Sequence, residues 1–398
     1  MRGDDMQSGG GMGFDFVQDY RPSWETDDVA IFRNAARKFL EAEFKPHIDR
    51  WSKQGFIDKS AWRAAGQAGF LCPSIPEEYG GGGGTIAHHF AWLEEVERIT
   101  LGAAFGDGVH SGICAHYLLE FGTEPQKRLW LPKLASGEVV CAIGMTEPGT
   151  GSDLQSVKTR AVAKGDGFQI NGQKTFITNG QNADLIILVA KTDPEARAKG
   201  ISLMLVDMSL PGVTRGRNLE KIGLHAADTS ELFFEDVPVT SEAVLGGKTG
   251  QGFYQLMNQL PQERLLIAVG AVASMETGLD LTIDYVKARR AFGQAIFDFQ
   301  NTKHKLAEAV TEARVARVFV DDCVERLLAG RLDSKIASMA KWWATQKQNE
   351  VLDLCVQLHG GYGYMSEYPI ARMWTDARVQ KIYGGTNEIM KELIARSL

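Results

Sequence analysis

A loop rich in glycine and hydroxyl groups follows the apolar run 139–143. It has the sequence Gly-Met-Thr-Glu-Pro-Gly-Thr-Gly-Ser-Asp over residues 144–153. The pattern predicts a strand that opens into a tight loop. Because glycine lets backbone N–H groups approach a ligand closely, and Thr146, Thr150 and Ser152 add side-chain donors, this loop could hold a flat polar ring or a phosphate. A turn that binds nothing would have the same composition.

A second candidate segment, Lys-Thr-Phe-Ile-Thr-Asn-Gly, occupies residues 174–180. Phe176 could stack on a planar ring, and Thr178 could hydrogen-bond to it. A strand that ends in a type I′ turn is the simpler interpretation, since Asn-Gly is a preferred pair in that turn. That interpretation accounts for Asn179 and Gly180 but leaves Phe176 and Thr178 unexplained.

The last third of the chain carries arginines and paired glycines. Arg289 and Arg290 precede Ala-Phe-Gly at 291–293, and glycine pairs occur at 360–361 and 384–385. Backbone amides in such turns can face a pyrophosphate or a carbonyl oxygen, and arginine offers a planar fork for phosphate. Each glycine pair taken alone is more often the C-terminal cap of a helix.

The elements that must position these residues change in type twice along the chain. Apolar residues recur at intervals of three and four from about residue 26 to 136, which predicts helices. Over 139–245, short β-rich runs such as 185–189 alternate with Asn-Gly and Pro-Gly turns, which predicts strands. Long apolar stripes that begin near Leu265 and Ala309 predict an antiparallel helix bundle.

We therefore expect a multidomain α+β protein. A chain of 398 residues is too long for one ordinary core, and its 44% hydrophobic and 23% charged residues are typical of a globular protein. The predicted parts are a disordered leader at 1–25, an N-terminal helical domain at 26–138, a middle antiparallel β-domain at 139–246 and a C-terminal four-helix bundle at 247–398.

Composition excludes several classes of protein. The net charge of −7 argues against nucleic acid as the main partner. The five cysteines are scattered without metal-type spacing, so we expect reduced thiols and no metal site. No apolar run approaches the roughly 18 to 20 residues that span a bilayer, and the N-terminus resembles neither a signal nor a transit peptide. We therefore expect a cytoplasmic protein with no membrane span.

Together these motifs closely resemble the acyl-CoA dehydrogenase family of flavoproteins. The resemblance runs from about residue 26 to the C-terminus. It includes the Thr-Glu-Pro-x-x-Gly-Ser-Asp loop, the Ile-Thr-Asn-Gly turn, the Arg-x-x-Phe-Gly segment and the Gly-Gly-x-Gly tract. The long-chain branch is the most similar, through residues 260–268 and 382–394. The resemblance implies an FAD cofactor, an acyl-CoA substrate and a homotetramer.

The resemblance also assigns ligand contacts position by position. The implied FAD contacts are Ile143, Met145, Thr146, Ser152, Phe176, Thr178, Arg289, Gln300, Gln357, Gly360, Gly361, Thr386 and Glu388. In the family, the contacts at positions 289 and 300 usually cross a subunit boundary. The implied acyl-CoA contacts are Ser152, Tyr254, Pro261, Gln262, Arg264, Gly384 and Gly385. Arg264 could orient the base, hold the substrate or form a structural salt bridge.

The catalytic base departs from the pattern common in this family. Many members carry a glutamate directly before the Gly-Thr of the C-terminal motif, and here that position is Gly384. The long-chain and isovaleryl branches place the base on the helix that carries Glu263, so the resemblance implies Glu263. A base of this kind needs a raised pKa, which burial would supply. A solvated, ion-paired role for Glu263 is the alternative, and Glu388 is a weaker competitor as base.

The resemblance implies α,β-dehydrogenation of a long-chain acyl-CoA to the trans-2-enoyl-CoA. FAD would accept the β-hydride, and an electron-transfer flavoprotein would receive the electrons. A backbone N–H of Gly384 or Gly385, with a ribityl hydroxyl of the flavin, would stabilise the enolate oxygen. The alternatives are an isovaleryl-type branched short-chain enzyme, a flavin monooxygenase of this fold, against which Glu263 argues, and a non-catalytic acyl-CoA-binding homologue.

Overall fold

The structure is a computed structural model and describes residues 20–398. Most of the leader predicted at 1–25 lies outside the described residues. The part that is described, residues 20–25, packs against the protein, contrary to the prediction. Trp24 is 4% exposed, and its indole Nε1 donates to Asp321 Oδ1 at 2.9 Å. A large ring that is buried with its N–H paired explains why this segment is held in place.

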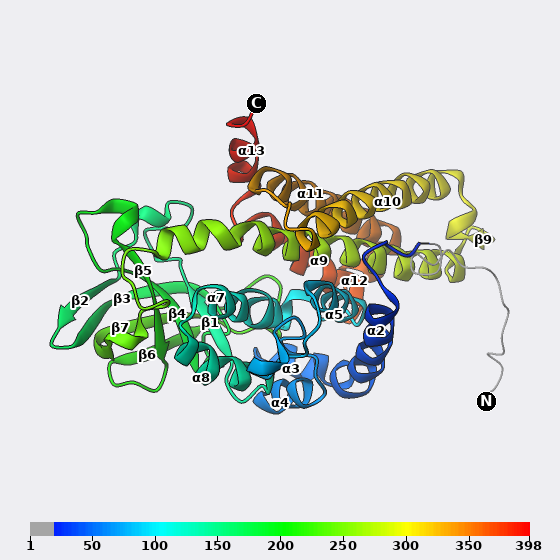
Figure 1. Ribbon diagram of the computed structural model, residues 1–398. Helices are drawn as coiled ribbons and strands as arrows, with labels where there is room; N and C mark the ends of the chain where they lie inside the picture. Colours follow the sequence, from blue (N-terminus) through cyan, green and yellow to red (C-terminus); the bar gives the residue numbers. More distant parts are fainter. Residues whose placement is uncertain (1–19) are drawn as a thin grey trace.

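The N-terminal region is helical, as predicted (Figure 1). Its α-helices are α2 (Asp27–Phe39), α3 (Ile48–Gln54), α4 (Lys59–Gln67), α5 (Ile86–Arg98), α6 (Asp107–Val109), α7 (Ala115–Phe121) and α8 (Glu124–Ala135). They enclose an aromatic core in which the rings of Phe70 and Trp92 stack with centroids 4.9 Å apart. α8 begins with a capping box between Thr123 and Gln126, and Pro125 occupies its first turn.

The middle region is a seven-stranded sheet. Its strands are β1 (Cys141–Gly144), β2 (Arg160–Lys164), β3 (Gly167–Thr178), β4 (Leu185–Lys191), β5 (Ile201–Asp207), β6 (Val213–Asn218) and β7 (Thr229–Thr240). They follow the order β1-β4-β2-β3-β7-β6, and β5 pairs with β4. β4 is almost wholly buried, which explains its continuous apolar sequence.

The sheet is mixed, whereas the sequence predicted an antiparallel one. β1 runs parallel to β4, with Cys141 opposite Leu185 and Gly144 opposite Leu188, and β2 meets β4 in parallel at Arg160 and Lys191. Parallel pairing requires a long crossover connection, which residues 145–184 provide. The prediction failed because tight-turn motifs report only on strands that a short turn joins.

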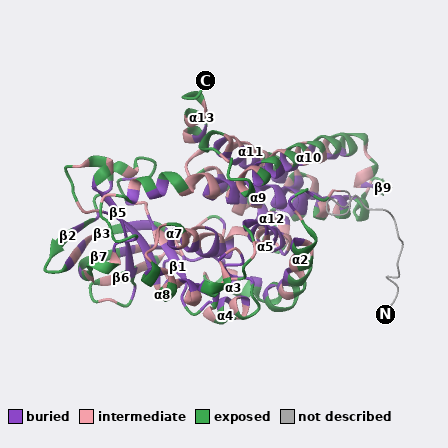
Figure 2. Ribbon diagram, viewed as in Figure 1, coloured by how far each residue is buried: buried purple, intermediate pink, exposed green. Residues whose placement is uncertain are grey.

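Three long helices form the body of the C-terminal region. These are α9 (Gly252–Ala288), α10 (Gln300–Leu328) and α11 (Ser334–His359), and the shorter α12 (Pro369–Ala377) and α13 (Asn387–Ala395) pack on α11. The short strands β8 (Arg290–Ala291) and β9 (Gln294–Ala295) pair between α9 and α10. α9 runs from the edge of the sheet to the opposite end of the molecule (Figure 1). Buried residues concentrate along it, where α5 and α11 pack on it (Figure 2).

By length and composition, α9 is apolar enough to cross a membrane, and it alone passes this test among the helices of residues 20–398. The expectation that no segment approaches this length was therefore wrong. Polar residues interrupt the apolar runs of α9 but leave its mean hydropathy high. Because 78% of its most apolar window is buried inside the protein, its apolar surface serves the core.

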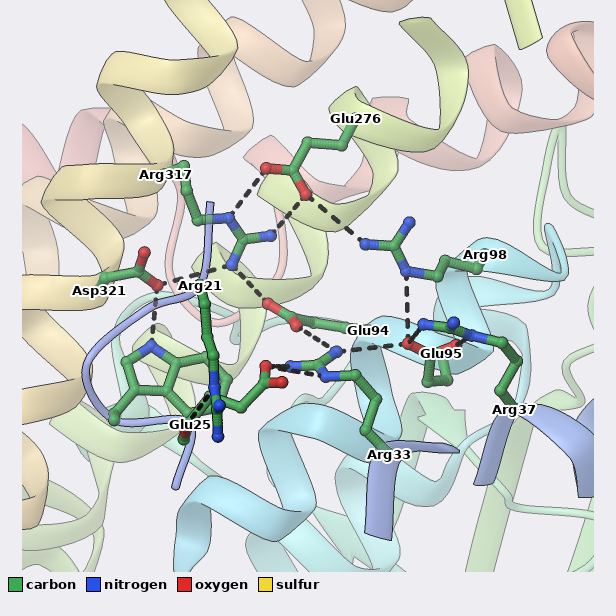
Figure 3. A network of polar contacts seen from close by, with 11 residues as sticks. Arg21, Glu25, Arg33, Arg37, Glu94, Glu95, Arg98, Glu276, Arg317 and Asp321 are labelled. Atoms are coloured by element: carbon green, nitrogen blue, oxygen red, sulfur yellow. Dashed lines mark hydrogen bonds and ion pairs between the residues drawn. The ribbon is translucent and has the colours of Figure 1, made fainter. Parts of the chain in front are cut away.

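A buried ion-pair network fixes α9 against the neighbouring helices (Figure 3). Arg317 of α10 forms a bidentate pair with Glu276 of α9, with nitrogen–oxygen distances of 2.9 and 2.7 Å. Arg317 also contacts Glu94 of α5, which Arg33 of α2 contacts at 2.7 Å. Removing one member of such a network leaves a buried charge unpaired, at a cost of about 3–5 kcal/mol. The network therefore ties α9, the helix that carries Glu263, to α10, α5 and α2.

Candidate active site

Glu263 lies in the first half of α9 and points into the protein. It is 5% exposed, and Tyr117 of α7 donates a hydrogen bond from its hydroxyl to Glu263 Oε1 at 2.8 Å. Burial raises the pKa of Glu263 to about 7, although the Tyr117 hydrogen bond and the positive charge of Arg264 oppose this rise. The alternative of a solvated glutamate is therefore wrong. A carboxyl with this pKa can gain and lose a proton near neutral pH.

Arg264 is buried beside the base but bonds to a different helix. Its Nη1 donates to Ser334 Oγ at 2.8 Å and to Ser338 Oγ at 3.2 Å, both on α11. Burial lowers the pKa of Arg264, and the nearby charge of Glu263 opposes that effect. These contacts make Arg264 a link between α9 and α11. Its electrostatic influence on Glu263 is a consequence of proximity rather than of a direct ion pair.

The turn at Gly384 and Gly385 lies on the same face of α9 as Glu263. Both glycines have left-handed backbone conformations, with φ of 64° and 90°. A Cβ atom on Gly384 would come within 2.3 Å of Ile267 Cδ1, so Ile267 would have to move. Ile267 is four residues beyond Glu263, which is one turn along the same helix face. The structure thus brings together the glutamate and the turn that the sequence linked to one reaction.

The glycine-rich loop after β1 is anchored by a buried ion pair that the sequence did not reveal. Lys174 of β3 donates from Nζ to Glu147 Oε1 at 2.8 Å, and both side chains are buried. Burial lowers the pKa of Lys174 to about 8, and Glu147 opposes the shift. Thr150 is also structural, because it exchanges backbone hydrogen bonds with Glu147.

Other residues of this loop remain accessible to a ligand. Ile143, Met145 and Thr146 are half-buried, and Ser152 is exposed. A Cβ on Gly149 or Gly151 would meet no atom within 4 Å. The loop therefore presents backbone and hydroxyl groups to open space, on a base that the Lys174–Glu147 pair holds in place.

Phe176 has a strained backbone and an exposed ring. Its φ is 59°, which is unusual for a bulky residue, and its side chain is 68% exposed. It lies at a break in the pairing of β3 with β7, between Lys174 and Ile177. Strain of this kind persists where the surrounding structure enforces it, often at ligand sites. Phe176 and the half-buried Thr178 thus lie at the C-terminal end of β3 in a form suited to a planar ligand.

The type I′ turn proposed for Asn179 and Gly180 is absent. That turn needs positive φ at both positions, but here only Asn179, at 64°, has it. The side chain of Asn179 is buried and donates from Nδ2 to Gly106 O at 3.0 Å and to Cys141 O at 3.2 Å. Asn179 therefore joins the sheet to the N-terminal helices, a tertiary role that a local turn motif cannot reveal.

The remaining candidates from the start of α9 differ in exposure. Tyr254 is 64% exposed, and Pro261 lies within the helix. Gln262 donates from Nε2 to Gly112 O at 3.0 Å, so it ties α9 to the segment before α7.

The residues after Gly385 form the start of α13. Thr386 caps the helix by accepting a hydrogen bond from the Ile389 backbone N–H at 3.3 Å. Glu388 is exposed, and hydrogen bonding at the helix start lowers its pKa. An exposed carboxyl with a lowered pKa is a poor candidate for the base.

A second group of candidates lies at the other end of α9. Arg289, Gln300, Gln357, Gly360 and Gly361 are all exposed. The Arg289 guanidinium lies 5.6 Å from the ring centroid of Tyr362. From Glu263 to Arg289 the helix rises on the order of 40 Å at 1.5 Å per residue, which is longer than an extended dinucleotide. One chain therefore does not bring these residues to the site beside Glu263.

Neither metal nor thiol chemistry is evident in residues 20–398. In this part of the chain no three His, Cys, Asp or Glu side chains are arranged to hold a metal ion. All five cysteines lie within it as buried free thiols.

Sequence reasoning missed two residues near the site. Tyr117, the partner of Glu263, had no motif around it. Lys341 of α11 donates to the Gly385 carbonyl oxygen at 2.7 Å. Its signal was a lysine among the buried alanines at 337, 340 and 344 of an otherwise ordinary helix stripe.

Comparisons with known proteins point to one family over almost the whole chain. Family models for acyl-CoA dehydrogenase match residues 26–138 (N-terminal domain), 142–237 (middle domain) and 250–398 (C-terminal domain). The chain is 49% identical over 371 residues to the mitochondrial long-chain specific acyl-CoA dehydrogenase of Mus musculus, covering 92% of this chain and 86% of the relative.

Solved structures give the same result. An acyl-CoA dehydrogenase from Geobacillus kaustophilus has a TM-score of 0.92 and 48% identity, covering 95% of this chain and 99% of that one. A glutaryl-CoA dehydrogenase from Mycobacterium smegmatis in complex with FADH2 has a TM-score of 0.88 and 26% identity, covering 96% of each chain.

Proposed function

Because this chain belongs to the acyl-CoA dehydrogenase family, we propose that it oxidises a long-chain acyl-CoA to the trans-2-enoyl-CoA with Glu263 as the base. One observation carries the proposal. Glu263 is buried with a pKa raised to about 7, on the helix face where Gly384 packs without a side chain. Desolvation by burial is how proteins prepare a carboxyl to remove a weakly acidic proton.

The loop after β1 and the C-terminal end of β3 fit the FAD that this family uses. The loop at 144–153 offers accessible hydroxyl and backbone groups, and the exposed ring of Phe176 offers a flat surface for an isoalloxazine. Bound FAD supplies the acceptor for the hydride that leaves the β carbon. The protein contributes position and electrostatics.

Glu263 would remove the proton from the carbon next to the thioester carbonyl. The hydroxyl of Tyr117 holds one carboxyl oxygen at 2.8 Å and so limits the orientations of the base. A backbone N–H of Gly384 or Gly385 would donate to the thioester oxygen as negative charge develops on it. Donors that are fixed before the reaction stabilise this charge most effectively.

The two ends of α9 support a proposal about assembly. The exposed group around Arg289 is too far from Glu263 to reach the same dinucleotide within one chain. We therefore infer that these residues contact the FAD of a neighbouring subunit, as in a homotetramer. An electron-transfer flavoprotein is the proposed electron acceptor, and the cytoplasm the proposed location.

The preference for long chains rests on the 49% identity to a long-chain enzyme. An isovaleryl-type enzyme would also place its base at Glu263, so the base does not separate the two. A comparison of turnover on palmitoyl-CoA and on isovaleryl-CoA separates the two kinds of enzyme. Faster turnover of isovaleryl-CoA would reject the long-chain proposal and leave the reaction class intact.

The reaction class is tested by anaerobic titration with acyl-CoAs of graded length. The wild-type protein is expected to bleach its flavin absorbance, whereas Glu263→Gln binds FAD and ligand but bleaches at least about 10³-fold more slowly. Glu392→Gln, which changes an exposed glutamate of α13 outside the proposed site, is the control and is expected to bleach normally. A wild-type protein that binds acyl-CoA without bleaching would instead be a non-catalytic homologue, and rapid bleaching by Glu263→Gln would reject this base.

A further inference from the structure

Lys341 is a buried cation beneath the Gly384–Gly385 turn. It is 0% exposed in the first half of α11, and its Nζ donates to Gly385 O at 2.7 Å and to Asn387 Oδ1 at 3.1 Å. Both of these acceptors are uncharged oxygens. A buried ammonium group without a carboxylate partner is costly to a fold. Its retention at this position therefore calls for an explanation beyond packing.

The turn is held between two helices. On one side, Gly384 rests against Ile267 of α9, so that even a Cβ atom would displace that residue. On the other side, Lys341 and Asn387 connect the turn to α11, and Asn387 receives a further hydrogen bond from Thr345 Oγ1 at 3.2 Å. The position of the turn relative to Glu263 thus depends on the contact with Lys341.

Two adjacent glycines cannot by themselves fix the direction of their N–H groups. Glycine populates left-handed and right-handed conformations almost equally, and both residues here are left-handed, with φ of 64° and 90°. An ammonium group bound to the Gly385 carbonyl fixes the peptide between Gly385 and Thr386, and so anchors the end of the turn that carries the N–H groups of Gly384 and Gly385. A donor of this kind contributes to catalysis only if it is oriented before charge develops.

We propose that Lys341 is a positioning residue, which fixes the Gly384–Gly385 turn so that a backbone N–H faces the developing enolate oxygen. This inference rests on the proposed function. Lys341 acts through the turn and does not itself touch the substrate. Arg264 of α9 and Glu388 of α13 are the charged groups that act on it, and they oppose one another. The pKa of Lys341 is lowered to about 7, and burial is the largest cause.

The test separates enolate formation from turnover and from binding. The probe is a long-chain 3-thia-acyl-CoA, whose α proton is acidic but whose sulfur replaces the β carbon, so that no hydride can leave. Deprotonation beside the oxidised flavin gives a long-wavelength absorption band. In Lys341→Met we expect this band and kcat to fall about 30-fold, because a misdirected oxyanion donor is costly, while KM, ligand affinity and FAD content stay within about threefold.

Lys335→Met is the matched control, because it makes the same change at an exposed position of the same helix. It is expected to behave as wild type. If Lys341→Met does not fold, Lys341→Gln replaces it. Its neutral amide can fill the polar space but is shorter than lysine, and the same changes in the absorption band and kcat are expected. A folded variant with an unchanged band and kcat would overturn the proposal. So would a parallel loss of FAD and ligand binding, which indicates a structural role. Absence of the band in the wild type would instead count against the proposed function.

Discussion

The two ends of α9 differ in how much of a site one chain completes. Around Glu263 the important groups are buried: Tyr117 bonds to the carboxyl group, and Arg264 bonds to α11. Around Arg289 they are exposed, and Phe292 is 95% exposed. Proton abstraction requires a desolvated carboxyl, which only a closed interior can provide. An open arginine and open glycines suit a ligand or subunit that arrives from outside. The chain therefore encloses the carboxyl group of Glu263 at one end of α9 and leaves the Arg289 group exposed at the other.

Lowering the pH should have the largest effect, because it protonates Glu263 at the buried end of α9. The pKa of Glu263 is raised to about 7, and the base must be deprotonated, so kcat/KM should rise with pH and level off above about 7. At pH 5 we expect kcat/KM to be about 100-fold lower than at the plateau, because it falls about tenfold for each pH unit below the pKa. Tyr117, Arg264 and Cys114 are the titratable groups that face Glu263. Steady-state kinetics with a long-chain acyl-CoA check this, and a flat profile from pH 5 to 8 would contradict it.

Gly384→Ala should displace the Gly384–Gly385 turn beside Glu263, because the added methyl group has no room. The new methyl group would meet Ile267 Cδ1 at 2.3 Å and would also disfavour the φ of 64°. We expect kcat to fall about 30-fold as the turn shifts its donor. Ile267→Ala added to this variant should recover part of the loss. Gly108→Ala is the control, because its methyl meets an atom only at 3.9 Å. Full activity of Gly384→Ala would show that the turn is not constrained there.

Tyr117→Phe should act on the base without changing its burial. The hydroxyl stabilises the ionised form of Glu263, so its removal should raise the pKa of Glu263 above about 7. A hydrogen bond to a charged group is worth about 1.5 kcal/mol, which corresponds to about one pH unit. The midpoint of the kcat/KM profile should move upward by that amount, with about tenfold lower activity at pH 6. An unmoved midpoint would mean that this bond does not stabilise the carboxylate.

Arg289→Ala should weaken FAD binding at the exposed end of α9 and leave the groups around Glu263 unchanged. We expect FAD to dissociate about fivefold more readily, because an exposed charge contributes on the order of 1 kcal/mol. The kcat of the fully flavin-loaded protein should be unchanged. Arg290→Ala is the matched control, since the Arg290 side chain donates to Gly293 O within its own hairpin. FAD retention is measured by fluorescence after dilution. Equal effects of the two substitutions would remove the distinction between the two ends.

Most of the fold was predictable because it depends on local pattern. Apolar stripes with helical period predicted α9 and α10, and the β-rich run at 185–189 predicted β4. The parallel pairing of β1 with β4 was not predictable, since the two strands are joined through a long connection. Asn179 was misinterpreted for a related reason: its side chain bonds to backbone from two distant segments.

The sequence by itself determined the helix–sheet–helix order, the motifs of the family and the replacement of a carboxylate by Gly384. These follow from residue type and spacing, which a linear chain displays directly. Only the tertiary structure decided that Glu263 is buried, that Tyr117 bonds to it and that Lys341 holds the Gly385 carbonyl. A raised pKa and an oriented donor arise from desolvation and from contacts between segments far apart in sequence, and these exist only after the chain has folded.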